Sequence, residues 1–321
     1  VIWNVAKTEP SSVKWFRNAM LVAIAIAVGY GLFLTTTGGL NPYIMSIMNL
    51  LDVRQDMESY YEAAGGGRLF GRISSVFVHP MSYAFFLGLS FIYVFQSRLY
   101  IKKVFIALLL IAVGASAITC GVRSVLGGLV VAVAYFFLMS KDYKMMIGVI
   151  VVALIVYYIA DSIPELSKYL GSMADINNTK VDVSGSSVDM RLNQLEGAIK
   201  EGNKNPLFGL GYGWTGYYKS LRGDHPVCLA FESLIYVIIC NFGLFGFAIW
   251  TYMVLKYMKN NRIMHLSENV LFDCLIVFYI SYSCITGEYG YMKTFLIFYI
   301  LMLCNQLQIP IKQTKVSGSR V

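Results

Sequence analysis

The chain holds a histidine and a glutamate at a spacing that could activate a hydroxyl group. Glu232 follows His225 by seven residues, and Pro226 comes directly after the histidine. Proline is favoured in the first turn of a helix, and seven helical residues make two turns, so this spacing predicts both side chains on one helix face, about 10 Å apart. The histidine could take a proton from a hydroxyl, and the glutamate could be the base itself or hold the histidine. The alternative is a helix-capping histidine and a glutamate paired with a neighbouring arginine.

Three arginines could bind a phosphate-containing substrate. Arg123 lies between two apolar runs, Arg191 lies in a long polar stretch, and Arg72 precedes another apolar run. An arginine at the bilayer boundary is costly and is a functional candidate, although it can also snorkel to lipid headgroups. Arg191 could equally be a solvated surface residue, and Arg72 an ordinary interfacial one. The planar guanidinium of arginine binds two phosphate oxygens at once and keeps its positive charge, so arginine suits a diphosphate. It would also stabilise the negative charge that develops on a diphosphate leaving group.

A glycine-rich segment, residues 205–213, could be mistaken for a nucleotide-binding fingerprint. Gly209, Gly211 and Gly213 alternate with other residues there. A dinucleotide fingerprint needs a strand before the glycines and a helix that opens on them, and the sequence predicts neither. We therefore expect a tight turn whose glycines let the backbone approach another segment closely.

The remaining candidates indicate structure rather than chemistry. The six cysteines include no C-x-x-C pair and lie mostly in apolar runs, so they are expected to be small core residues, not a disulfide framework or a metal site. His79 precedes Pro80 and is interpreted as the first residue of a helix more than as a ligand. We expect no metal and no cofactor.

The composition is that of an integral membrane protein. Hydrophobic residues make up 57% of the chain and charged residues 14%, whereas soluble domains carry roughly 25% charged residues, and the mean hydropathy is +0.61. The net charge of +8 is spread over many loops instead of forming one stripe, which argues against a nucleic-acid partner. Because the chain begins with Val1 in what reads as the end of an apolar segment, we expect an N-terminal truncation.

The apolar runs predict an all-α polytopic membrane protein with about eight transmembrane helices. A span needs about 20 mostly apolar residues. The candidates are 19–36, 80–97, 103–121, 122–140, 144–160, 227–257, 269–286 and 291–309. The run 227–257 exceeds one span, so we interpret it as a re-entrant or partly embedded helix, a break near residues 241–243, and a crossing helix. The predicted division is 1–160 with an outer loop at 37–79, then an extracytoplasmic loop at 161–226, helices over 227–310, and a cytoplasmic tail at 311–321.

Basic residues orient these spans. They fall on alternate turns of the chain, so all of them can be cytoplasmic at once. They are Lys14, Arg17, Arg98, Lys102, Lys103, Lys141, Lys144, Lys256, Lys259, Arg262, Lys312, Lys315 and Arg320. The long outer loop 161–226 is then expected to carry a short amphipathic helix around residues 190–199, with Asp189 before it and Gly202 after it.

The order of these motifs resembles that of the O-antigen polymerase and O-antigen ligase superfamily of bacterial glycosyltransferases. The resemblance covers roughly residues 65–260. It is carried by segments 71–80, 119–124, 205–213 and 241–246, together with the Arg191 helix and the His225–Glu232 pair.

The resemblance implies a fold like that of GT-C-type glycosyltransferases and a metal-independent reaction outside the bacterial cytoplasmic membrane. Its substrates would be an undecaprenyl-diphosphate-linked glycan donor and a glycan acceptor, with membrane lipids, a chain-length regulator and a flippase of the same pathway as further partners. Arg123 and Arg191 would hold the diphosphate, assisted by Arg72. Glu232 occupies the family's acceptor-side spacing before Gly243, whereas His225 lies earlier, so the base stays open between them. A polymerase is favoured over a ligase, and a transporter or flippase is the third alternative.

Overall fold

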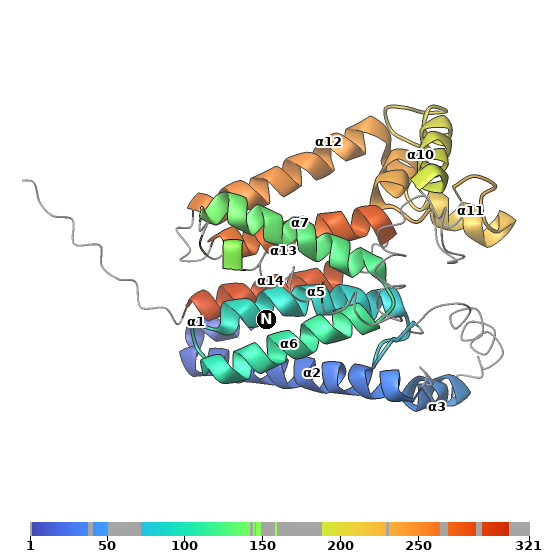
Figure 1. Ribbon diagram of the computed structural model, residues 1–321. Coiled ribbons are helices and arrows are strands. Elements are labelled where there is room, and N and C mark those ends of the chain that lie inside the picture. The colour runs from blue at the N-terminus through green and yellow to red at the C-terminus, as the bar shows by residue number, and fades with distance from the viewer. Residues whose placement is uncertain are drawn as a thin grey trace, which may run out of the picture.

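The computed structural model describes residues 2–37, 41–50, 72–141, 144, 146–148, 158, 188–228, 231–263, 269–286 and 291–307. Every regular element in these ranges is a helix (Figure 1). The helices are α1 (Ile2–Thr8), α2 (Pro10–Thr36), α3 (Pro42–Leu50), α5 (Pro80–Ser97), α6 (Lys103–Thr119), α7 (Arg123–Ser140), α10 (Val188–Gly202), α11 (Trp214–Arg222), α12 (Leu234–Ile263), α13 (Asn269–Thr286) and α14 (Tyr291–Gln306). The described part of the chain therefore has the predicted all-α class.

The long helices lie side by side and run in both directions along the bundle, which therefore has two distinct ends (Figure 1). One end, which we call the basic end, has the expected basic residues at its helix termini, including Lys14, Arg98, Lys103, Lys141 and Lys259. The other end, which we call the loop end, carries α3, α10, α11 and the junction between α6 and α7. The alternate turns that the sequence assigned to opposite faces thus lie at opposite ends of the bundle.

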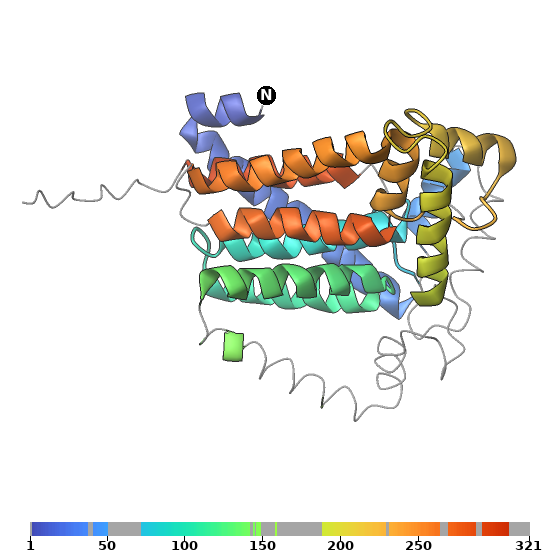
Figure 2. The same ribbon diagram turned by 90° about the horizontal axis from the view of Figure 1, so that it is seen from above.

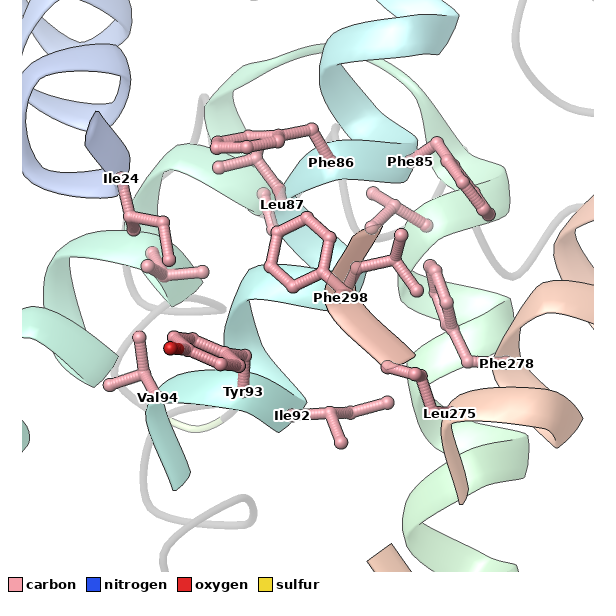
Figure 3. Packing of buried hydrophobic residues seen from close by; sticks show 14 of the residues in the cluster. Ile24, Phe85, Phe86, Leu87, Ile92, Tyr93, Val94, Leu275, Phe278 and Phe298 are labelled. Atoms are coloured by element: carbon pink, nitrogen blue, oxygen red, sulfur yellow. The ribbon is translucent and has the colours of Figure 1, made fainter. Parts of the chain in front are cut away.

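Aromatic residues pack the bundle around α5, which is buried over most of its length. Phe85 stacks on Phe278 of α13 with ring centres 5.7 Å apart, and Phe86 meets Phe298 of α14 at 5.6 Å (Figure 3). A Cβ atom added to Gly88 would collide with the Phe278 ring, and one added to Gly128 would lie 3.0 Å from the same ring, a tight contact. Small residues at these two positions therefore let α5 and α7 approach α13 closely. Such close packing stabilises helix association in a membrane, because lipid tails are as apolar as the helix side chains and supply no hydrophobic driving force.

The predicted spans coincide with helices, but fewer of them qualify as spans than predicted. In the described ranges, four helical segments are long and apolar enough to cross a membrane by length and composition, namely Ser11–Thr36, Arg123–Ser140, Leu234–Asn261 and Asn269–Thr286. The α6 helix is apolar but shorter. The predicted count of about eight is therefore not reached among the described residues, and most of the candidate 144–160 lies outside them, as does 161–187.

The helix expected to begin near residue 227 begins at Leu234 and extends to Ile263. It is interrupted at Gly243, which has φ 61° and ψ −158°, so the predicted break near residues 241–243 is confirmed. The amphipathic helix expected at 190–199 is α10, which lies across the loop end at a steep angle to the bundle (Figure 2). These two elements position the site described next.

Candidate functional site

The glycine-rich turn and the kink of α12 bind each other through their backbones. The amides of Leu210 and Gly211 donate to the carbonyls of Cys240 and Asn241, at 2.7 and 3.1 Å. In return the first two amides after the kink, those of Leu244 and Phe245, donate to the carbonyls of Pro206 and Leu207, at 2.9 and 3.0 Å. We call this pairing of residues 206–211 with residues 240–245 the backbone clasp. It satisfies polar groups that the kink would otherwise leave without helical partners.

Gly209 and Gly243 make the clasp possible. Gly209 has φ +69°, and a Cβ there would lie 2.5 Å from the carbonyl carbon of Asn241 and from the amide of Phe242. Gly243 has φ +61°, and its Cβ would lie 2.6 Å from the Pro206 carbonyl oxygen. The expectation of a close backbone approach is thus confirmed at Gly209, and the segment it approaches is the kink of α12.

Replacing Gly209 with alanine is expected to lower stability by about 2–5 kcal/mol, because the substitution adds left-handed strain to a steric overlap with backbone. Two matched variants separate these causes. Gly211 has φ +111° with open space around a built Cβ, so Gly211→Ala adds strain alone, and helical Gly216 also has open space and should tolerate alanine. Thermal unfolding of the purified variants checks the order Gly209→Ala lowest, then Gly211→Ala, then Gly216→Ala. Equal melting temperatures for the three would contradict the clasp.

Asn241 extends the clasp to α11. Its side-chain oxygen accepts the Thr215 amide at 3.0 Å, and its side-chain nitrogen donates to the Thr215 hydroxyl at 3.3 Å. The residue before α11 is Gly213, which has no side chain to cap the helix, so α12 supplies the cap instead. Sequence reasoning missed this role, although the position of Asn241 beside a predicted break was a usable signal.

His225 is buried and holds the turn that leads to α12. Its Nδ1 atom accepts the backbone amides of Val227 and Cys228 at 3.1 and 2.9 Å, which assigns the neutral ring's proton to Nε2. Nε2 lies 3.7 Å from a carboxylate oxygen of Glu201 on α10. The rings of Tyr218 and Phe231 enclose the imidazole with ring centres at 5.2 and 5.7 Å.

The expected helix face shared by His225 and Glu232 is wrong. Residues 226–228 and Phe231 form turns, and α12 starts only at Leu234. Phe231 has φ +55°, which is unusual for a bulky residue. The bonds of the imidazole resemble a helix cap, but the left-handed φ of Phe231 breaks the helical path before Glu232. His79 shows the same bond in a helical setting, because its Nδ1 accepts the Met81 amide at the start of α5, as expected for a helix-capping histidine.

Glu232 pairs with Arg191. A guanidinium nitrogen of Arg191 lies 3.4 Å from the Glu232 carboxylate, and the other terminal nitrogen donates to the main-chain oxygens of Glu232 and Ile285, at 3.3 and 2.9 Å. The hydroxyl of Tyr236 donates in turn to the Arg191 carbonyl at 3.0 Å. Arg191 therefore fastens α10 to the start of α12 and to the end of α13, and the alternative of a glutamate paired with an arginine describes this geometry.

The other two arginines lie at the same loop end. Arg123 is the first residue of α7, and the amide of Ile73, next to Arg72, donates to the Cys120 carbonyl at 3.3 Å. Ser124 lies beside Tyr282 of α13, one turn before the Ile285 carbonyl that Arg191 contacts. The fold brings the three arginine-bearing segments to one end of the bundle, and their roles toward a substrate stay predictions.

The cysteines contribute no reactive site. All six are free thiols, and five of them are buried, as expected for core residues. Burial raises the pKa of the Cys228 thiol to about 11, so at neutral pH it stays protonated and donates to the Gln194 carbonyl at 3.6 Å. Among the residues that the structure describes, no group of three or more His, Cys, Asp or Glu side chains could hold a metal ion.

The chain resembles a known protein family over part of its length. Residues 105–251 match the family model described as O-antigen ligase. This segment contains Arg123, Arg191, His225, Glu232 and the clasp, and it leaves out Arg72. The match confirms the resemblance to the O-antigen polymerase and ligase superfamily over this segment, which includes one of the four helical segments in the described ranges that are long and apolar enough to span a membrane, and most of a second. No curated protein matches the chain.

Proposed function

We propose that this protein polymerises undecaprenyl-diphosphate-linked oligosaccharide repeat units into O-antigen or capsular polysaccharide. The observation that carries the proposal is the position of Arg191, an arginine on a helix across the loop end whose guanidinium faces a carboxylate and two carbonyls of the bundle. A guanidinium held among oxygen ligands at a bundle end is a site where an anionic headgroup can bind while its lipid tail lies between or beside the helices. The family match supports the same reaction class.

In the proposed reaction, the acceptor hydroxyl attacks the anomeric carbon of the donor sugar. A new glycosidic bond forms as the bond to the diphosphate breaks, and undecaprenyl diphosphate leaves with the electron pair. Arg191 and Arg123, assisted by Arg72, stabilise the charge that develops on the leaving diphosphate. Glu232 accepts the proton of the attacking hydroxyl. His225 is a positioning residue, since its Nδ1 is already occupied by two amides.

The pairing of Arg191 with Glu232 implies that the donor binds before Glu232 acts as the base. The carboxylate and the donor diphosphate are both anionic ligands of the same guanidinium. The diphosphate carries the greater negative charge and can bind both prongs of the fork, so it displaces the carboxylate from Arg191. Glu232 is then free to act as a base only after the donor has bound.

The loop end is proposed to face the extracytoplasmic side of the bacterial inner membrane. The basic residues at the end of α5, at the start of α6 and at the end of α7 lie at the opposite end of the bundle, and short loops rich in lysine and arginine stay in the cytoplasm. Undecaprenyl-diphosphate-linked glycans are joined on the outer side, which agrees with this orientation. A ligase that moves the glycan to a lipid A core or a protein is the second candidate, because the matching family is described as O-antigen ligase.

Reconstitution in liposomes tests the proposal. The purified protein is offered the lipid-linked repeat unit that accumulates in cells lacking it, with and without lipid A core, and products are separated by size. A ladder of longer lipid-linked glycans without lipid A core supports the polymerase. Transfer that occurs only onto the core identifies a ligase, and movement of the lipid across the bilayer without a new bond identifies a transporter.

A further inference from the structure

Gln194 is a fully buried amide that has no hydrogen-bond partner. Its exposed fraction is 0%, and neither its side-chain oxygen nor its side-chain nitrogen is bonded within the described part of the chain. Leu192, two residues earlier on the same helix, is 56% exposed. The amphipathic pattern of α10 is therefore reversed at this point, with a polar side chain inside and an apolar one outside.

The inner face of α10 shows where this amide lies. The main-chain carbonyls of Arg191, Gln194 and Ala198 accept the side chains of Tyr236, Cys228 and Cys240, respectively. All three donors belong to the segment that leads into α12 and to its first turns. Gln194 thus lies between α10 and α12, three residues after Arg191 on the same face. We call this contact, from Arg191 to Ala198 on α10 and from Cys228 to Cys240 opposite, the α10 seam.

Gln194 lies one helical turn after Arg191, so its side chain is expected to lean toward the Arg191 end of the seam. Side chains on a helix lean toward its N-terminus and cover the preceding turn. For Gln194 that turn carries Arg191, whose guanidinium holds Glu232. A buried amide one turn from the arginine therefore adds one donor group and one acceptor group to this part of the seam.

A buried amide without hydrogen-bond partners, such as that of Gln194 among the described residues, lowers stability unless a ligand forms hydrogen bonds with it. A buried polar group without a partner loses its hydration and gains nothing in return, and native proteins keep few of them. Methionine has nearly the same length and would fill the same space without this penalty. The position of Gln194 one turn after Arg191, whose guanidinium holds Glu232, indicates a ligand that supplies the missing hydrogen bonds.

We propose that Gln194 is a substrate-binding residue that recognises hydroxyl groups of the donor sugar next to the diphosphate held by Arg191. An amide side chain can donate to one hydroxyl and accept from its neighbour, which suits a sugar. The sugar reaches Gln194 when the diphosphate replaces Glu232 on Arg191 and the α10 seam opens. This inference rests on the proposed function and names the group that distinguishes a glycosylated donor from the bare lipid diphosphate.

The test compares stability with binding in Gln194→Met. The probes are the undecaprenyl-diphosphate glycolipid that accumulates in cells lacking this protein, and undecaprenyl diphosphate itself. We expect the melting temperature of Gln194→Met to rise by roughly 2–4 °C, because an unsatisfied amide is removed. We also expect its affinity for the glycolipid to fall roughly 10- to 100-fold, while its affinity for undecaprenyl diphosphate stays unchanged. Asn193→Leu, at the exposed neighbouring amide, is the matched control and should change neither affinity.

Two results would overturn the inference. A melting temperature below that of the wild type would mean that a buried water or another group already satisfies the amide. Unchanged affinity for both lipids would mean that the amide does not touch the sugar. A different result would contradict the proposed function alone. In that case the wild-type protein binds the glycolipid but forms no new glycosidic bond, and Gln194→Met still binds the glycolipid more weakly than the wild type.

Discussion

Arg191→Ala is expected to abolish polymer growth in cells and to lower the rate of glycosyl transfer by about 100- to 1,000-fold in vitro. Removing one preorganised donor to a developing negative charge has an effect of this size in other enzymes. Arg191 supplies two nitrogens at the loop end, one on the Glu232 carboxylate and one on main-chain oxygens. Chain-length ladders from cells, and transfer rates with the lipid-linked repeat unit, measure the loss. Arg123→Ala is expected to have an effect of the same kind.

A second set of variants separates binding of the diphosphate from attachment of α10. Arg191→Lys keeps the charge but loses the paired geometry, so we expect the Michaelis constant for the donor to rise while the protein stays folded. Arg222→Ala is the matched control, because Arg222 is an exposed arginine at the end of α11, 5.6 Å from the Tyr218 ring. Normal ladders in both Arg191→Ala and Arg123→Ala would exclude the arginine site. Equal losses in Arg191→Ala and Arg222→Ala would indicate a general charge effect.

The helices could be predicted from the sequence because apolar length is a property of each segment alone. The runs at 80–97 and 269–286 coincide with α5 and α13 to the residue. The long run 227–257 exceeded one span, and the surplus correctly indicated a break, which falls at Gly243. Crossing a membrane requires greater length and hydrophobicity than forming a helix, so within the described ranges fewer helices qualify as spans than the apolar runs suggested.

The site was harder to predict, because its contacts join segments that are distant in the chain. The glycine pattern indicated a close approach at Gly209, but nothing local to it identified the kink of α12 as the partner. The spacing of His225 and Glu232 was treated as helical since an apolar run follows. The imidazole accepts two amides as a helix cap would, but Phe231 takes a left-handed φ and α12 begins only at Leu234. The burial of Gln194 could not be predicted from the sequence pattern, because a polar residue on an amphipathic helix is expected to face outward.

Glu232→Gln is expected to lower the turnover number by about 100- to 10,000-fold, the range that general base catalysis contributes. The same variant should lower the Michaelis constant for the donor, because a neutral amide no longer competes with the diphosphate for Arg191. A mutation that lowers both constants has removed an interaction that opposed substrate binding as well as one used in the transition state. An unchanged turnover number would make Glu232 only the ionic partner of Arg191, and equal residual activity in Glu232→Gln and His225→Ala would mean that neither is the base.

Two substitutions of His225 decide whether it also acts as a base. Asparagine can accept backbone amides two and three residues ahead, as the imidazole Nδ1 does at Val227 and Cys228, but it cannot take up a proton. We therefore expect His225→Asn to keep most of the activity and stability that His225→Ala loses. If His225→Asn is folded yet as inactive as His225→Ala, the histidine is the base, because its role in the turn has been restored without its chemistry. Rescue by asparagine leaves Glu232 as the group that activates the acceptor, with His225 holding the turn that presents it.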